Sequence, residues 1–170
     1  SSRSGSEVLT HKGVPSRSRM LIVAAQVAAH PRVSQLTGVP RHVRQVDMMI
    51  DTGARFSVLS ESVIQSLNVA PIGTTSVRTS LHQVEECAVY HLAMALSFTD
   101  EYGEDPLAEI PLSVIARPAS PKDLPKDMAF IHDGLLGLDF LQPFRLIYDG
   151  PTTGFELTCA ILPQLSLPKP

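Results

Sequence analysis

The segment that most constrains this chain is Asp51-Thr52-Gly53-Ala54, which lies between two apolar stretches. Met48-Met49-Ile50 precedes it, and Ser57-Val58-Leu59 follows after two further residues. An apolar run that meets an acid, a small hydroxyl residue and a glycine predicts a buried strand ending in a tight loop. The pattern therefore predicts one carboxylate, that of Asp51, held on a loop at the floor of a site.

A second motif lies downstream, at Gly134-Leu135-Leu136-Gly137-Leu138-Asp139-Phe140-Leu141. Its first half is apolar and short, which predicts a strand. Gly137 suits a close turn because it has no Cβ to meet the neighbouring backbone. The residues after Gly137 predict a short helix.

Together and in this order, the two motifs resemble the catalytic loop and the closing strand and helix of the aspartic proteases, in particular the retropepsins. The resemblance covers residues 20–160. It implies an all-β fold, a retropepsin-like closed barrel with one short helix after the Gly137 motif, acting as a homodimer. The C-terminal part, from Asp139-Phe140-Leu141 to Phe155-Glu156-Leu157, is more similar to cellular, bacterial or retrotransposon-type members than to retroviral ones.

The resemblance also implies a role for each residue of the first loop. Asp51 is the catalytic residue, and the Thr52 hydroxyl ties the loop to that of a partner subunit. Gly53 and Ala54 keep the floor of the cleft small, and Ser57 supports the loop. Taken alone, Asp-Thr-Gly would favour a carboxylate that caps a turn, and Ala54, Ser57 and the Gly137 motif favour the catalytic role. The two hydroxyl groups could also make ordinary local contacts.

The chain carries one Asp-Thr-Gly only. Aspartic proteolysis needs two carboxylates that share a proton, because two like charges at that range cannot both ionise without a large cost. A single copy can supply this pair only where a two-fold axis passes beside Asp51. We therefore expect a homodimeric aspartic endopeptidase that activates a water molecule, acts on peptide or protein substrates and needs no metal or other cofactor.

Further residues are expected around the substrate cleft. Retroviral members usually have acids where this chain has Arg55 and Phe56, so their substrate preference does not transfer. Leu138 replaces a common family Arg, so the usual ion pair at that place is not expected. The polar segment Ser80–Glu86 falls at the position of the family's flap, the hairpin that closes over substrate, although it lacks the glycines of many flap tips. The expected cleft residues are Arg55, Phe56, Leu81, His82, Gln83, Leu135, Leu136 and Gly137, of which Leu135 and Leu136 fit a cleft wall or the core equally well.

The chain is expected to form one domain over residues 20–160, between a flexible arm at 1–19 and a Pro-rich tail at 161–170. Pro31, Gly38 and Pro40 predict a loop over His30–Pro40. A short helix is predicted over Glu61–Leu67, capped by Ser60. The predicted strands are Met20–Ala29, Val43–Ile50, two β-like stretches within Thr74–Phe98, Glu109–Ala116, and a C-terminal hairpin formed by Phe144–Tyr148 and Phe155–Cys159.

Composition argues against several other functions. The net charge is −3 and Trp is absent, which speaks against nucleic-acid binding. Cys87 and Cys159 are the only cysteines, and no Cys/His spacing fits a zinc site. The apolar stretch Met20–Ala29 has 10 residues, whereas a bilayer crossing needs about 20. We expect no membrane span and a cytoplasmic location.

Two other interpretations remain open from the sequence. A retropepsin-like dimer could bind peptides or scaffold an assembly without cutting, which the unusual flap centre and Arg55 favour. Alternatively, the domain could be excised from a larger polyprotein, as the missing initiator Met suggests.

Overall fold

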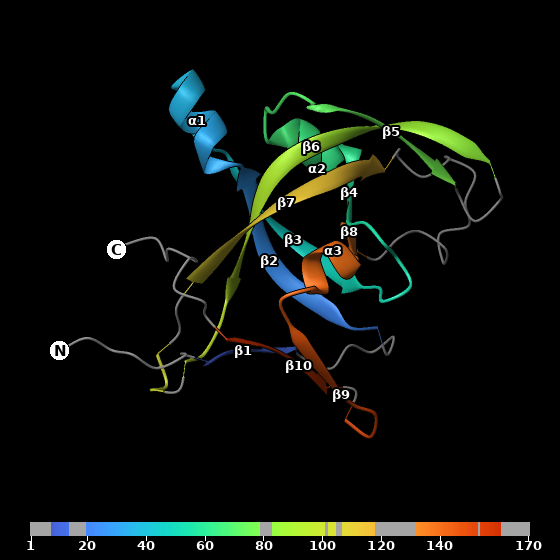
Figure 1. Cartoon of the computed structure of the whole chain (residues 1–170). Helices are drawn as coiled ribbons and strands as arrows, with labels where there is room; N and C mark the ends of the chain where they lie inside the picture. The colour runs from blue at the N-terminus through green and yellow to red at the C-terminus, as the bar shows by residue number, and fades with distance from the viewer. Residues whose placement is uncertain are drawn as a thin grey trace.

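The computed structural model describes residues 8–13, 20–78, 83–100, 102–104, 107–117, 132–152 and 154–160. These residues form a mostly β fold with short helices (Figure 1). The strands are β1 Val8–Gly13, β2 Ile22–Ala29, β3 Val43–Ile50, β4 Val58–Ser60, β5 Gly73–Arg78, β6 Val84–Ser97, β7 Leu107–Arg117, β8 Gly134–Leu136, β9 Arg145–Asp149 and β10 Gly154–Ala160. The helices are α1 Pro31–Thr37, α2 Glu61–Ser66 and α3 Leu138–Leu141.

Six strands close into a barrel. The larger sheet has the order β2-β3-β8-β4-β7-β6-β5, and β2 also pairs with β6. The pairing of β2 with β6 closes the barrel. Strand β5 pairs with β6 and lies outside the closed barrel. The closed barrel is the architecture that the sequence predicted, and the predicted short helix after Gly137 is α3.

Alternation along β3 fills the barrel. Val46, Met48 and Ile50 are buried, whereas Asp47 is exposed, as expected when successive side chains point to opposite faces of a sheet. The fully buried side chains of the core include Val23, Leu59, Leu96, Val114 and Leu136, which come from five different barrel strands.

The short strand β8 links the two motifs of the sequence. It pairs in parallel with β3, where Ile50 is aligned with Leu136, and antiparallel with β4, where Val58 is aligned with Leu135. The strand thus lies between the segment that precedes Asp51 and the segment that follows Ser57. This insertion brings the Gly137 turn next to the Asp51 loop.

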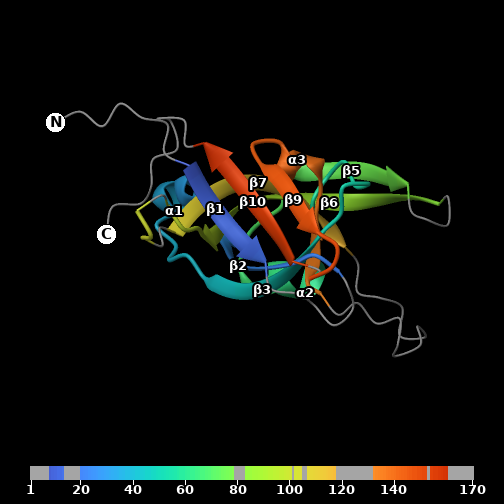
Figure 2. The same cartoon turned by 90° about the horizontal axis from the view of Figure 1, so that it is seen from below.

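A second, three-stranded sheet covers one side of the barrel, with β10 between β1 and β9 (Figure 2). Leu9, Phe155 and Leu157 of this sheet belong to the same apolar core as the barrel strands. The ring of Phe144 stacks on Phe98 and on Phe140, with ring centroids 5.9 and 5.2 Å apart. The C-terminal hairpin predicted from the sequence is therefore present as β9 and β10.

Two sequence predictions need correction. Residues 8–13, expected within a flexible arm, form β1, which pairs with β10 along its whole length. The expected loop at His30–Pro40 contains α1, whose N-cap His30 accepts a hydrogen bond from the Arg32 N–H. Pro31 opens this helix and Gly38, with φ of 67°, ends it. Both residues are favoured at those helix positions, Pro because its missing N–H is not needed there and Gly because it tolerates positive φ.

The remaining elements agree with the sequence, with local differences. Ser60 stands at the N-cap of α2, but its side chain makes no capping hydrogen bond. Strand β7 includes Pro111, in a part of the strand that β4 does not reach, as expected for a residue without a donor N–H. No helix in the described part of the chain is long and apolar enough to cross a membrane. The predicted Pro-rich tail lies outside the described residues.

Candidate active site

Asp51 is the first residue after β3, and backbone hydrogen bonds fix its loop. Its N–H donates to the Leu136 carbonyl at 3.0 Å, which continues the β3–β8 pairing by one step. The Ala54 N–H donates back to the Asp51 carbonyl at 3.1 Å, closing a tight turn. The Gly53 N–H donates to Asp51 Oδ1 at 2.9 Å. A carboxylate that accepts a backbone N–H has a fixed orientation, so the loop presents Asp51 in a defined pose.

The start of α3 supports this loop from the other side. The Leu138 N–H donates to the Ala54 carbonyl at 2.8 Å, and the Asp139 N–H donates to the Arg55 carbonyl at 3.2 Å. A Cβ at Gly137 would lie 2.8 Å from the Ala54 carbonyl oxygen. The backbones of the Asp51 loop and of the Gly137 turn can approach this closely only because residue 137 is Gly.

Ser57 and Asp139 lock the two motifs together. The Ser57 hydroxyl donates to Asp139 Oδ1 at 2.7 Å, and the Ser57 N–H donates to Asp139 Oδ2 at 3.0 Å. The Gly137 N–H in turn donates to Ser57 Oγ at 3.0 Å, and the Phe140 N–H to Asp139 Oδ1 at 2.8 Å. Ser57, Gly137 and Phe140 are buried, so each of these bonds satisfies a donor that water cannot reach.

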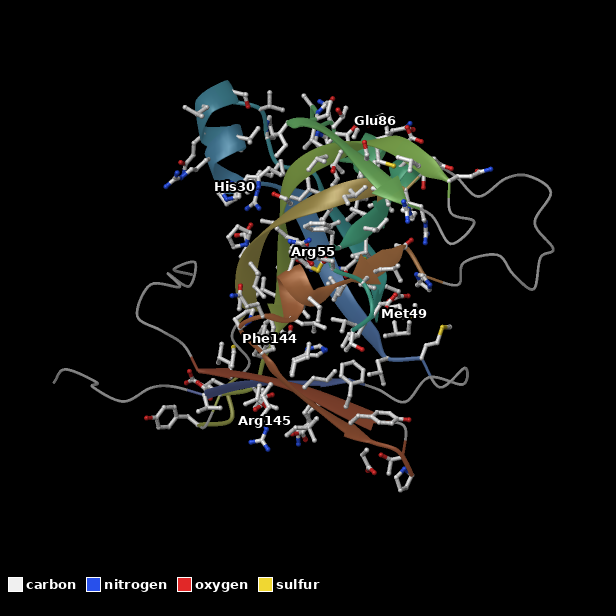
Figure 3. The ribbon with its side chains drawn as sticks, turned by 45° about the vertical axis from the view of Figure 1, so that its right-hand side comes forward. His30, Met49, Arg55, Glu86, Phe144 and Arg145 are labelled. Atoms are coloured by element: carbon white, nitrogen blue, oxygen red, sulfur yellow. The ribbon has the colours of Figure 1, made fainter. Side chains whose placement is uncertain are left out.

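The residues of the Asp51 loop leave the floor of the site open to solvent. Thr52 and Gly53 are exposed, and Asp51 and Ala54 are half-buried. Arg55 and Phe56 are exposed beside them, with the Arg55 guanidinium carbon 5.2 Å from the centre of the Phe56 ring. Arg55 lies next to α3 in the side-chain view (Figure 3), consistent with the hydrogen bond from Asp139 to its carbonyl.

The other expected cleft residues have different positions. Leu136 is completely buried and belongs to the core, which is one of the two interpretations that the sequence left open. Gly137 is also buried and acts in the turn beneath the loop, whereas Leu135 is half-buried. Gln83 is exposed just before β6. Leu81 and His82 lie outside the described residues.

Asp139 is the residue bonded to this loop that the sequence motifs did not single out. It is not followed by Thr-Gly, and the sequence analysis assigned it no role beyond membership of the Gly137 motif. The signal that could have identified it is the combination of a buried hydroxyl at Ser57 with an acid in the first turn of a helix that closes the same loop. Leu138, for which no ion pair is expected, is exposed.

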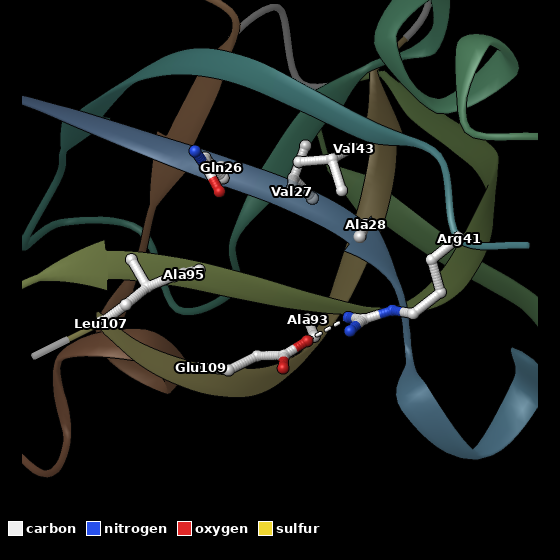
Figure 4. Close-up of a pocket in the computed structure, with 9 residues that line it drawn as sticks. All are labelled: Gln26, Val27, Ala28, Arg41, Val43, Ala93, Ala95, Leu107 and Glu109. Atoms are coloured by element: carbon white, nitrogen blue, oxygen red, sulfur yellow. Dashed lines mark hydrogen bonds and ion pairs between the residues drawn. The ribbon is translucent and has the colours of Figure 1, made fainter. Parts of the chain in front are cut away.

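The described residues offer no metal site, and a small hollow lies away from the Asp51 loop. No group of three or more His, Cys, Asp or Glu side chains among the described residues is arranged to hold a metal ion. A hollow of about 100 Å³ is closed on one side by the ion pair of Arg41 with Glu109 (Figure 4). Ala28 of β2 lines the hollow and pairs with Val43 at the start of β3. Asp51 follows the other end of β3, so the hollow lies away from the Asp51 loop. Pockets that hold small ligands measure about 300 Å³ or more, so this hollow is too small for a peptide.

Comparison with known proteins gives the class of the chain. Residues 36–140, more than half of the chain, match a family model described as aspartyl protease. The fold is similar to that of a retropepsin-like aspartic protease from Rickettsia conorii, with a TM-score of 0.52 and 18% sequence identity, over 95% of this chain and 100% of that chain. A comparison with curated proteins finds no match.

The chain therefore belongs to the aspartyl protease family, and its fold is that of the retropepsins. It is an aspartic peptidase, as the sequence motifs predicted.

Proposed function

We propose that the chain is a homodimeric endopeptidase in which the Asp51 carboxylates of two subunits form the catalytic pair. The observation that carries this proposal is the open position of the Asp51 loop: Thr52 and Gly53 are exposed, and the carboxylate is held by its own backbone. The other carboxylate bonded to this loop, Asp139, accepts hydrogen bonds from Ser57 and Phe140. Asp139 therefore serves the loop and is not available as the second member of a pair.

The chemistry follows from two carboxylates at close range. One proton is shared, so the ionised member takes a proton from water while the protonated member polarises the peptide carbonyl. Activity then depends on the singly protonated pair and has a bell-shaped pH profile whose two pKa values belong to the pair. The Thr52 hydroxyl ties the two loops together across the axis.

The three-stranded sheet supports dimerisation. In the order β1-β10-β9, strand β9 is an edge strand, and its Ile147 and Tyr148 side chains are exposed. A strand edge with exposed apolar side chains is a template for pairing with another chain. The C-terminal hairpin therefore contributes to the subunit interface, and the β5–β6 hairpin, whose arms are aligned from Gly73 with Val89 to Arg78 with Val84, acts as the flap.

Asp51→Asn tests the proposal. The amide keeps the shape of the side chain but cannot share a proton, so peptide hydrolysis is expected to fall by about 10²-fold or more while the thermal unfolding temperature stays close to that of the wild type. Wild-type protein mixed with an excess of Asp51→Asn should lose activity, because a heterodimer carries one ionisable member of the pair. Specific activity should also fall on dilution to the concentrations at which sedimentation shows that the dimer dissociates. A monomer with full specific activity, or peptide binding without turnover in the wild type, contradicts the proposal.

A further inference from the structure

The segment Arg55–Phe56 joins the catalytic loop to its buried support, and its two side chains are exposed. Ala54 is held by the Leu138 N–H and Ser57 by Asp139, so the backbone is anchored on both sides of this pair. The Arg55 carbonyl itself accepts from the Asp139 N–H. A side chain on a backbone fixed in this way can act in recognition, because little ordering is left to oppose binding.

The turn keeps Arg55 close to the reacting carboxylate. A four-residue turn closed by a hydrogen bond, such as Asp51 to Ala54, brings its end Cα atoms within about 7 Å. One more residue adds about 3.8 Å. An extended peptide advances about 3.3 Å per residue. A substrate lying across Asp51 therefore reaches Arg55 with a side chain within about three residues of the bond that is cut.

The Arg55 guanidinium has a charge that no carboxylate among the described residues neutralises, since none lies within ion-pair distance of it. Its carbon lies 5.2 Å from the centre of the Phe56 ring, a distance at which the ring face attracts a cation. An aromatic ring on one side holds the guanidinium plane and leaves its N–H groups free to bind a carboxylate with two parallel hydrogen bonds. Phe56 is 50% exposed and offers an apolar contact beside it.

We propose that Arg55 is a specificity-determining residue that selects substrates with an Asp or Glu side chain within about three residues of the scissile bond. The inference rests on the proposed function for the chemistry of cleavage, and on the position of Arg55 for the preference. Without this cation, the negative charge of the catalytic pair would repel an acidic substrate.

The test uses matched peptides that carry Glu or Gln at one position at a time on each side of a cleaved bond. The wild type should cleave at least one Glu peptide about fivefold faster, in kcat/KM, than its Gln partner. Arg55→Ala should bring this ratio to about one, and Arg55→Glu should favour the corresponding Lys peptide. The preference should weaken between about 0.05 M and about 0.5 M salt, because exposed charges are screened.

Arg32→Ala is the matched control. It removes the same charge from α1, which follows the end of β2 opposite the Asp51 loop, and should leave the Glu-to-Gln ratio unchanged. Equal cleavage of every Glu and Gln pair by the wild type, or an unchanged ratio in Arg55→Ala, overturns the inference while leaving the peptidase intact.

Binding separates this inference from the proposed function. Fluorescence anisotropy of the labelled Glu and Gln peptides is measured with the wild type and Arg55→Ala. If no peptide is cleaved but the Glu peptide binds more tightly in an Arg55-dependent way, the preference stands and the proposed homodimeric catalysis fails. Equal binding of both peptides, in the absence of cleavage, overturns the inference.

Discussion

Ser57 and Asp139 lie 82 residues apart in the sequence and are joined by two hydrogen bonds of 2.7 and 3.0 Å. One donor is the Ser57 hydroxyl and the other is its N–H. This contact connects the segment after the catalytic loop to the first turn of α3. The Asp51 loop therefore depends on a second acid, Asp139, that holds it.

Breaking this contact should damage both stability and activity. Ser57→Ala and Asp139→Asn are each expected to lower the free energy of unfolding by about 1–3 kcal/mol, because a buried donor or acceptor loses its partner. The double variant should lose less than the sum, since the two residues share one network. The rate of peptide hydrolysis should fall in both variants as the Asp51 loop loosens. Urea unfolding and kinetics measure these effects, and additive losses would contradict the coupling.

Ser62→Ala is the control for this pair. Ser62 is exposed on α2, and its hydroxyl contacts only the Ser60 hydroxyl, at 3.4 Å, among the described residues. Its replacement should change the free energy of unfolding by less than about 0.5 kcal/mol.

Gly134 and Gly73 should respond oppositely to Ala. A Cβ at Gly134 would lie 2.1 Å from the Val58 carbonyl oxygen, which is backbone and cannot move without disturbing the β4–β8 pairing. We expect Gly134→Ala to destabilise the protein by about 1–3 kcal/mol or to prevent folding. A Cβ at Gly73 meets nothing within 4 Å, so Gly73→Ala should be neutral or slightly stabilising. Thermal unfolding of the two variants measures this difference, and similar stabilities would contradict the close approach of β8 and β4.

The cap of α1 should weaken in acid. Burial lowers the pKa of His30 below its usual 6.5, and the nearby His91 ring and Arg32 lower this pKa further, while Glu109 raises it and Arg41 lowers it. The His30 and His91 rings are stacked with centroids 4.3 Å apart. The folded state therefore prefers neutral His30, and this contribution to stability is present above pH 6.5 and is lost as the pH falls through the lowered pKa.

The geometry gives this pH effect a local signature. His30 Nδ1 accepts the hydrogen bond from the Arg32 N–H, and a protonated Nδ1 cannot accept it. Loss of an N-cap costs about 1 kcal/mol, so the protection factors of the α1 amides, which are corrected for the intrinsic pH dependence of exchange, should fall as the pH drops below 6.5. His30→Asn, which keeps a capping oxygen, should remove this dependence, and His42→Asn at an exposed position should not. Protection factors in α1 that do not vary with pH would contradict the prediction.

Leu9 and Val8 test whether β1 is a structural strand. Leu9 is 2% exposed within the core, and Val8 beside it is 41% exposed. Leu9→Ala should cost about 2–5 kcal/mol of unfolding free energy, because a buried leucine is replaced by a cavity. Val8→Ala should cost much less. Denaturant titration of the two variants measures the difference, and equal small effects would restore the sequence interpretation of this segment as a flexible arm.

The contrast between β3 and β1 shows what local sequence can predict. Val43–Ile50 carries an alternating apolar pattern that ends in Asp51, and both the strand and the loop were predicted with these bounds. Residues 8–13 contain only two large apolar side chains, Val8 and Leu9. Their strand forms because β10, at the other end of the domain, supplies the pairing partner, and no local pattern contains that information.

Helix α1 and Asp139 were missed for different reasons. Pro31 and Gly38 favour a loop when taken alone, and the same residue types also begin and end short helices. The role of Asp139 depends on its distance from Ser57, which only the folded chain defines. The prediction for Asp51 needs only its neighbours in sequence, because they are also its neighbours in the loop.

The insertion of β8 between β3 and β4 has a consequence for the order of folding. The strands on either side of the catalytic loop are adjacent in sequence, but the strand that separates them is made much later, with its supporting acid 82 residues beyond Ser57. Contacts over such separations form slowly, because the intervening chain must first be closed into a loop. Asp51 therefore leaves the ribosome long before its support exists, so a nascent chain has no assembled hydrolytic centre with which to attack unfolded polypeptides around it.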